Sequence, residues 1–178
     1  MKGKPITYKT FTVYPELCGY SLEEFTAISK VASSNYHIAS VRVPTKSKFL
    51  NMGVIIRNGQ IFYRRLKSRL YYPDESDTLE GKIKPEVIQL DKKNILFLVC
   101  YELLFPEDYL PVKTKPDIVI HIVGYPMVDE EQREGWVAMQ KALAIMLGCP
   151  LVCCCGGDRG RMNISAVMSN LDGEEVIK

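Results

Sequence analysis

The stretch that decides the fold of this chain is ILFLV, residues 95–99. A strand with one face in water alternates apolar and polar residues, whereas this run is apolar throughout. We therefore predict a central strand that is covered on both faces. Cys100 follows the run directly, so its thiol is expected where the strand ends and the chain bends.

Other strands and two helices can be placed around this run. The predicted strands cover residues 6–14, 38–43, 52–57, 60–66, 87–90, 95–99, 117–123, 150–155 and 164–168. Asn58-Gly59 is the strongest hairpin signal, because both turn positions can take a positive φ at little cost. Helices are predicted over residues 21–32 and 131–147, which carry a capping-box pattern and a terminal glycine, respectively. The pattern predicts one α/β domain over residues 1–178, with two packed sheets covered by helices.

The composition limits the partners that the protein can have. The formal net charge is +2, from 23 Lys and Arg against 21 Asp and Glu, which is too balanced for a nucleic-acid groove or an anionic membrane surface. No apolar run is long enough to cross a bilayer and no signal-peptide core follows Met1, so we expect a cytoplasmic protein. A small molecule and further copies of the chain are the expected partners.

The cysteines are expected to be reduced. Six cysteines would indicate a disulfide framework in a short secreted chain, but this chain is larger and rich in apolar strands. Cys153, Cys154 and Cys155 are consecutive, which suits alternate faces of a buried strand better than a zinc cage. His37 and His121 are the only histidines, so we expect neither a metal nor another cofactor. A thiol-redox role is a weaker alternative, because a spaced cysteine pair is missing.

Two interpretations of Cys100 follow from its position. A thiol on a bend after a strand is presented to substrate, while the backbone N–H groups that follow can face a developing oxyanion. Free cysteine is also among the most buried residue types, so a structural thiol is about equally expected. The apolar strand and the bend leave both interpretations open.

The residues that follow the bend resemble a known family. The segment CYELLFPE, residues 100–107, is similar to the nucleophile segment of the nitrilase, or carbon–nitrogen hydrolase, superfamily. In that segment a cysteine, an aromatic residue and an acid precede Phe-Pro-Glu. The resemblance implies that Cys100 is the nucleophile.

Two more segments resemble the same superfamily, in the family's order along the chain. YPEL, residues 14–17, is similar to the segment that carries the general base, which implies this role for Glu16; an exposed loop carboxylate is the alternative. KSRL, residues 67–70, is similar to the lysine segment, which implies that Lys67 stabilises charge. The alternative there is a solvated basic run, because three arginines lie close to this lysine in sequence.

The resemblance implies hydrolysis of a small linear amide or carbamoyl compound through a thioester at Cys100. Glu16 would accept the thiol proton and later return it to the leaving nitrogen. Lys67 and an N–H near Tyr101 would stabilise the oxyanion of each tetrahedral intermediate.

Substrate contacts are expected from three residues. Glu75 lies near the place where the family often carries a second glutamate that helps to position the lysine and the substrate, and a surface acid is the alternative. Tyr101 and Tyr125 are expected to line the substrate pocket. The identity of the amide does not follow from these residues.

The implied fold is a four-layer α-β-β-α sandwich of the nitrilase type, in truncated form. Only a short stretch precedes Glu16 and the chain stops at Lys178, so an N-terminal strand–helix unit and a C-terminal arm are expected to be missing. Sheet edges exposed in this way favour a homo-oligomer. The alternative function is a degenerate, non-catalytic family member that acts as a binding or oligomer-forming subunit.

Overall fold

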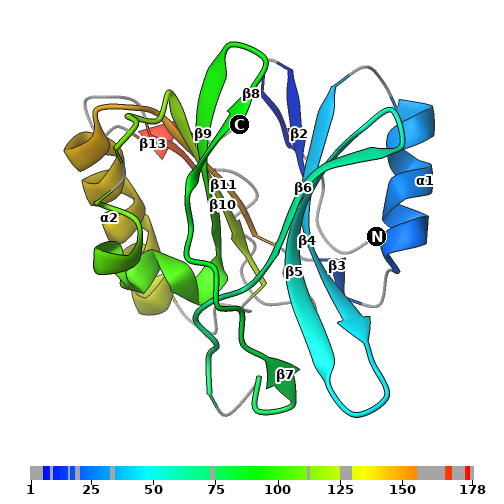
Figure 1. Ribbon diagram of the computed structural model, residues 1–178. Helices are drawn as coiled ribbons and strands as arrows, with labels where there is room; N and C mark the ends of the chain where they lie inside the picture. The colour runs from blue at the N-terminus through cyan, green and yellow to red at the C-terminus, as the bar shows by residue number, and fades with distance from the viewer. Residues whose placement is uncertain are drawn as a thin grey trace.

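Two β-sheets face each other between two helices in the computed structural model of this chain (Figure 1). The described residues are 6–8, 10–15, 17–18, 21–32, 35–72, 75–111, 113–124, 130–155, 167–169 and 175–176. Helix α1 (Leu22–Ala32) covers the outer face of one sheet and α2 (Glu130–Leu147) covers that of the other (Figure 1). The predicted four-layer α-β-β-α sandwich is therefore confirmed. Within these ranges no helix is both long and apolar enough to span a bilayer.

The first sheet is mixed, and its longest pairings, β4 with β5 and β5 with β6, are antiparallel. Its described strands are β1 (Ile6–Tyr8), β2 (Phe11–Val13), β3 (Leu17–Cys18), β4 (Tyr36–Pro44), β5 (Phe49–Arg57), β6 (Gln60–Leu66) and β7 (Thr78–Leu79). Their order is β1-β2-β4-β5-β6, with β3 beside β4 and β7 beside β5. The predicted hairpin is confirmed as β5 and β6, and its turn residues Asn58 and Gly59 have φ angles of 50° and 74°.

The second sheet places three parallel strands at its centre. Its described strands are β8 (Val87–Leu90), β9 (Lys93–Val99), β10 (Ile118–Val123), β11 (Leu151–Cys155), β12 (Val167–Ser169) and β13 (Glu175–Val176), in the order β13-β12-β11-β10-β9-β8. β9, β10 and β11 run parallel to one another. Two short 3₁₀ helices, η1 (Cys100–Leu104) and η2 (Pro106–Asp108), follow β9 and lead the chain away from the carboxyl end of this strand.

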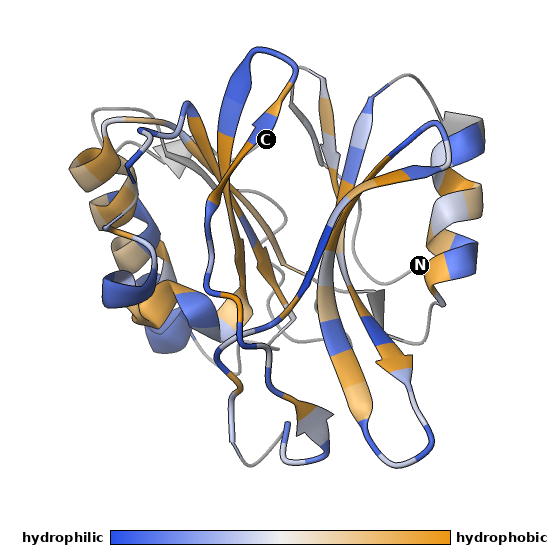
Figure 2. Cartoon of the chain, viewed as in Figure 1, coloured by the Kyte–Doolittle hydropathy of each residue, from blue (hydrophilic) through white to orange (hydrophobic). Residues whose placement is uncertain are grey.

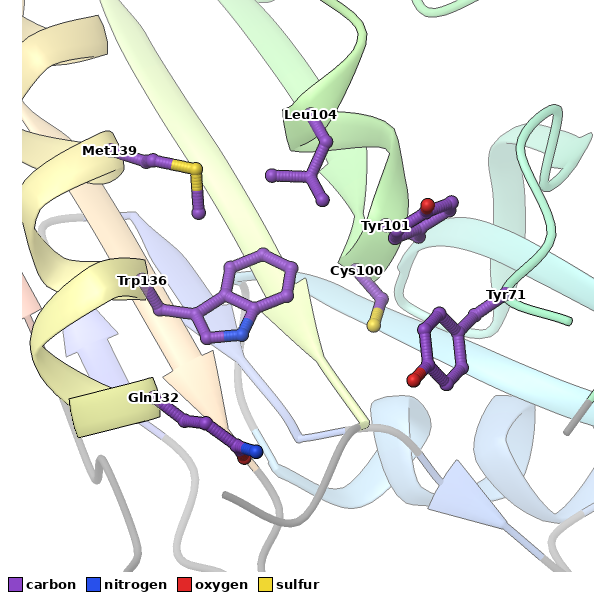
Figure 3. A pocket seen from close by; sticks show the side chains of 7 residues that line it. All are labelled: Tyr71, Cys100, Tyr101, Leu104, Gln132, Trp136 and Met139. Carbon is purple, nitrogen blue, oxygen red and sulfur yellow. The ribbon is translucent and has the colours of Figure 1, made fainter. Parts of the chain in front are cut away.

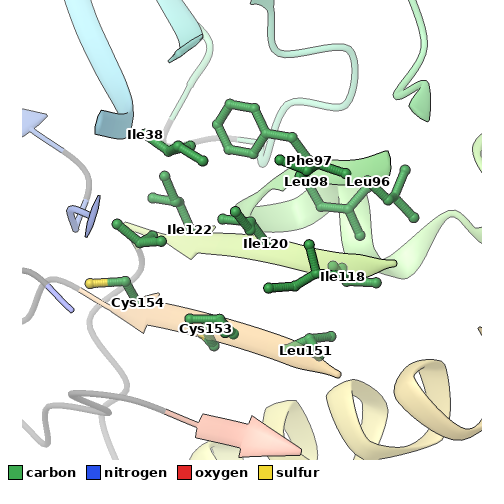
Figure 4. Packing of buried hydrophobic residues seen from close by; sticks show 14 of the residues in the cluster. Ile38, Leu96, Phe97, Leu98, Ile118, Ile120, Ile122, Leu151, Cys153 and Cys154 are labelled. Atoms are coloured by element: carbon green, nitrogen blue, oxygen red, sulfur yellow. The ribbon is translucent and has the colours of Figure 1, made fainter. Parts of the chain in front are cut away.

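The predicted central strand is confirmed, because every residue from Ile95 to Val99 is at most 1 % exposed. Alternate residues of a strand point to opposite faces, so Phe97 and its neighbour Ile120 face the first sheet while Leu98 faces α2. Ile38 from β4 meets this inner face, as Figure 4 shows. The largest apolar cluster thus lies on both faces of the second sheet.

The two sheets approach each other closely at Gly53 in β5. A Cβ atom added at this position would lie 2.8 Å from the ring of Phe97 and 3.2 Å from a methyl group of Val99. Real Cβ atoms do not approach other atoms to 2.8 Å, so only glycine fits without a shift of its neighbours. β5 and β9 are therefore in direct contact at the end of β9, immediately before the nucleophile segment.

A second, smaller cluster lies under α1. It includes Phe25 from the helix and Val54 from β5, both fully buried, and Figure 2 shows hydrophobic stretches on α1 and on the strands beside it. The capping box predicted for α1 is present, since the Ser21 N–H donates to Glu24 at 2.7 Å and the Glu24 N–H donates to the Ser21 hydroxyl at 3.1 Å.

One strand prediction is wrong, and another lies partly outside the described residues. The predicted strand over residues 6–14 is wrong as a single element, because the chain turns at Thr10 and forms the antiparallel pair β1 and β2. Within the prediction for residues 164–168, the structure describes only the part that belongs to β12.

Candidate active site

Cys100 lies at the carboxyl end of β9 and begins η1. Its φ is 49°, a left-handed conformation that costs energy for a residue with a side chain. The other two non-glycine residues of the described ranges with positive φ, Asn58 and Asp91, are of types that tolerate this region. Strained backbone that a protein maintains is concentrated at functional sites, which favours a functional over a structural thiol.

The bend at Cys100 is held by the buried carboxylate of Glu102. This carboxylate accepts the Val99 N–H at 2.8 Å, the Ser68 N–H at 2.8 Å and the Ser68 hydroxyl at 3.0 Å. Arg65 donates to both carboxylate oxygens at 2.5 Å and to the Phe97 carbonyl at 3.0 Å. One buried ion pair therefore ties β6 and the loop after it to the end of β9.

Lys67, the predicted charge stabiliser, is a buried cation. Its side chain is 2 % exposed and forms an ion pair with Glu75. Glu75 also accepts the Tyr71 N–H at 2.8 Å and the Asn51 side-chain amide at 2.9 Å, so the position of this carboxylate is set by three partners. The alternative of a solvated basic run is wrong for Lys67 and for Arg65, because both are buried against acids.

The loop that begins at Lys67 packs on the segment that begins at Cys100. The ring of Tyr71 lies edge-on to that of Tyr101, with centroids 5.3 Å apart. The Arg69 guanidinium lies 4.4 Å from the centre of the Phe105 ring and donates to Asp108 at 2.6 Å and 3.0 Å. These hydrogen bonds from Arg69 lower the pKa of the Asp108 carboxyl. The lysine loop and the nucleophile segment are thus joined at several points.

A cavity of about 230 Å³ lies beside the Cys100 thiol. Figure 3 shows the sulfur between the two tyrosine rings on one side and the indole of Trp136 on the other. Besides Cys100, the described residues that line the cavity are Tyr71, Tyr101, Leu104, Gln132, Trp136 and Met139. The cysteine is therefore open to a small molecule, and its surroundings are mainly apolar.

The buried side chain of His121 contacts the backbone carbonyl of Cys100. Its Nε2 lies 3.0 Å from the Cys100 carbonyl oxygen, and its Nδ1 lies 3.1 Å from the side-chain nitrogen of Gln140. A neutral ring with hydrogen on Nε2 satisfies both contacts, since Nε2 donates to the carbonyl and Nδ1 accepts from the amide. Trp136 stacks on this imidazole with centroids 5.6 Å apart. The carbonyl of the strained residue is thus held by a fully buried side chain.

Protonation of His121 is expected to make stability depend on pH. Burial lowers its pKa from 6.5 to about 4, so between these values the unfolded chain binds a proton that the folded protein does not. Stability should therefore fall as the pH drops from about 6.5 to about 4, by about 3 kcal/mol in total. Urea unfolding across this range measures the loss.

The control for that measurement is His121→Gln, which keeps an amide donor and does not titrate. Its stability should lack this component of the pH dependence. The same slope in wild type and variant would assign the effect to other groups. Glu102 and Lys67, whose charges act on His121 in opposite directions, are unchanged in both proteins.

The predicted site residues divide into three groups. Cys100 and Tyr101 line the cavity, and buried Lys67 is paired with half-buried Glu75 in the adjoining loop. Glu16 and Tyr125 lie outside the described residues, so their predictions stay untested. Within the described ranges, no group of three or more His, Cys, Asp or Glu side chains is arranged to hold a metal ion.

Sequence analysis missed the roles of Arg65, Glu102 and His121. Arg65 is one of the three arginines of the basic run, and strand alternation places it on the same face as Lys67. His121 is the one polar residue within the apolar strand β10. A lone polar residue in a buried strand requires a hydrogen-bond partner, and this requirement is the sequence signal that indicates a structural role for His121.

Comparison with known proteins identifies the family. Residues 7–169 match the family model described as carbon-nitrogen hydrolase, and the chain belongs to this family. The predicted membership of the nitrilase, or carbon–nitrogen hydrolase, superfamily is thereby confirmed. No curated protein matches the sequence significantly.

Solved structures share the fold. A carbon-nitrogen hydrolase from Helicobacter pylori G27 superimposes with a TM-score of 0.77 at 20 % identity, covering 93 % of this chain and 71 % of that one. A mutant amidase from Nesterenkonia sp. AN1, with acrylamide added to its active-site cysteine, gives a TM-score of 0.74 at 18 % identity, covering 93 % and 74 %. A CN-hydrolase superfamily protein from Xanthomonas campestris, with an arsenic adduct in its active site, gives 0.70 at 18 % identity, covering 93 % and 71 %.

Proposed function

We propose that this protein hydrolyses an amide or carbamoyl carbon–nitrogen bond of a small molecule, with Cys100 as the nucleophile. The observation that carries the proposal is the cavity at Cys100, where a thiol on strained backbone meets the loop that holds a buried lysine. Lys67 is the proposed oxyanion stabiliser and Glu16 the proposed general base. Membership of the carbon-nitrogen hydrolase family supports this chemistry.

The proposed reaction proceeds in two acyl transfers. Glu16 accepts the thiol proton as Cys100 Sγ bonds to the carbonyl carbon, and the carbonyl oxygen becomes negatively charged. The C–N bond then breaks, Glu16 returns the proton to the leaving nitrogen, and a thioester remains. Water attacks the thioester while Glu16 accepts its proton, after which the C–S bond breaks and the thiol recovers a proton.

Lys67 would stabilise the negative oxygen in both steps. Its ammonium group is fixed by Glu75 before the substrate arrives, so little reorganisation accompanies the reaction. Glu75 is proposed to position the lysine and the substrate. Tyr101 and Tyr125 are proposed substrate contacts, and the position of Tyr101 in the cavity lining supports its part.

The non-catalytic alternative receives no support from these residues, since a degenerate site has no need to keep buried Lys67 paired with Glu75 in the loop that adjoins the Cys100 cavity. A homo-oligomer remains a proposal, favoured by the exposure of Ile145 and Met146 on α2 at 57 % and 64 %. The cytoplasmic location remains a prediction.

Trapping of the acyl-enzyme tests the proposed function. The protein is incubated with a panel of small amides and quenched in acid, and the intact mass and the labelled peptide are then measured. We expect an acyl adduct on Cys100 in the wild type and none in Cys100→Ala. Cys149→Ala is the matched control, because burial raises the pKa of that thiol to about 11 and it lies outside the cavity lining.

Two outcomes would contradict the proposal. One is the absence of any adduct or turnover across the panel in a well-folded sample. The other is an adduct that persists in Cys100→Ala.

A further inference from the structure

We propose that the cavity beside Cys100 selects substrates whose acyl group is an uncharged apolar ring. This inference rests on the proposed function, in which Cys100 forms a thioester. In that intermediate the acyl carbon is bonded to Sγ, so the acyl group must occupy the space that Sγ faces. The amine has already left at that stage, and the cavity therefore acts mainly on the acyl side of the substrate.

The walls of the cavity are flat, apolar and fixed before a ligand binds. On one side, Tyr101 packs against Tyr71 at 5.3 Å and against Phe105 at 5.2 Å between ring centroids. On the opposite side, Trp136 stacks on the buried imidazole of His121. Two preorganised aromatic walls favour a ring that can pack between them, because little side-chain freedom is lost on binding.

The described lining of the cavity offers no cation to an acidic substrate. None of its described lining residues is ionisable as a carboxylate, ammonium or guanidinium group, and Gln132 contributes the amide. Lys67 is paired with Glu75 in the adjoining loop. A carboxylate on the acyl group would lose its hydration without gaining a cation, so acidic substrates should be disfavoured.

The size of the cavity argues for a single ring. Its volume of about 230 Å³ is below the usual range of drug-sized pockets, which begins at about 300 Å³. A methyl group would leave much of the apolar lining uncovered, whereas a six-membered ring would cover more of it. Because a ring amide removes more of the apolar lining from water than acetamide does, it should bind more tightly.

Binding can be measured without catalysis, because Trp136 is the only tryptophan of the chain. Its emission is followed in Cys100→Ala during titration with cyclohexanecarboxamide, acetamide and succinamate. We expect cyclohexanecarboxamide to bind at least about tenfold more tightly than acetamide. Succinamate, which carries a carboxylate, should bind more weakly than either. Equal or tighter binding of acetamide or succinamate overturns the inference.

A pair of variants on α2 tests the charge preference in the same Cys100→Ala background. Met139 lines the cavity and is 37 % exposed, so Met139→Lys adds a cation at its edge with little cost to folding. It should tighten succinamate binding about tenfold and weaken cyclohexanecarboxamide binding. Ile145→Lys is the control, since Ile145 is an exposed apolar residue of the same helix outside the lining. The same response in both variants would count against the cavity as the binding site.

The two proposals fail in different ways. Labelling of Cys100 without the expected ranking of ligands overturns the ring preference and leaves the hydrolase function standing. The expected ranking without any labelling or turnover removes the hydrolase function, and the cavity then remains a site for uncharged ring compounds.

Discussion

Replacing Glu102 with leucine is expected to lower the free energy of unfolding by about 3–5 kcal/mol. The change removes the negative partner of Arg65 and the acceptor of the Ser68 and Val99 N–H groups, all in a buried region. Arg65 cannot respond by losing its proton, because a guanidinium group stays charged at ordinary pH. An unpaired buried charge is therefore left behind. Urea unfolding at pH 7, followed by circular dichroism, measures the effect.

Arg65→Met is the matched comparison and should cost less, about 2 kcal/mol. Glu102 then keeps the three hydrogen bonds from Ser68 and Val99, so its buried charge is still compensated by donors. Failure of Glu102→Leu to fold while Arg65→Met folds would agree with this ranking. Equal losses, or a loss below about 1 kcal/mol in Glu102→Leu, would show that the ion pair does not hold the bend.

Replacing Lys67 with methionine is expected to reduce kcat by about 10²–10³-fold. The substitution keeps the length of the side chain and removes the cation proposed to face the oxyanion. The loss should appear in kcat and to a smaller extent in KM, because the charge on the oxygen is largest in the transition state. Steady-state kinetics with the best amide of the panel provide the measurement.

Lys84→Met is the control for this change. Lys84 lies 3.1 Å from Asp108 and is about half-exposed, so its removal tests the loss of a lysine near the same loop without touching the cavity lining. Its kcat should stay within about twofold of wild type. A similar loss in both variants would indicate a general electrostatic effect, and unchanged kcat in Lys67→Met would remove the lysine from the proposed mechanism. Folding is expected to survive, since Glu75 keeps the Tyr71 and Asn51 donors.

The fold was predictable where a local pattern determines the structure. Five apolar residues in a row predict a strand covered on both faces, and β9 has this environment. Asn58-Gly59 predicts a two-residue turn because both residues accept positive φ, and both adopt it. The turn at Thr10 has no comparable sequence signal, because residues 6–14 contain no glycine, proline or asparagine. The position of this turn depends on tertiary structure, in which β2 pairs with β4.

The site was predictable only as separate segments. Cys100 and Lys67 follow from motifs, but the contacts that place their segments together depend on tertiary structure. Arg65 and Glu102 meet across the two sheets, and their pairing depends on the register that sets Arg65 opposite Gly53 in β5. No pattern within either segment contains that register.

Gly53 affects the spacing of the two sheets and therefore the geometry of the proposed active site. Lys67 follows a strand of the first sheet and Cys100 follows a strand of the second, so the distance between the two side chains depends on the gap between the sheets. At Gly53 the backbone of β5 packs directly against the Phe97 ring, with no room for a side chain between them. A single added methyl group would push the two sheets apart and increase the distance between Lys67 and Cys100. The proposed chemistry would then change although position 53 does not contact the substrate. Random mutagenesis scored by turnover should therefore find position 53 as intolerant as the nucleophile itself.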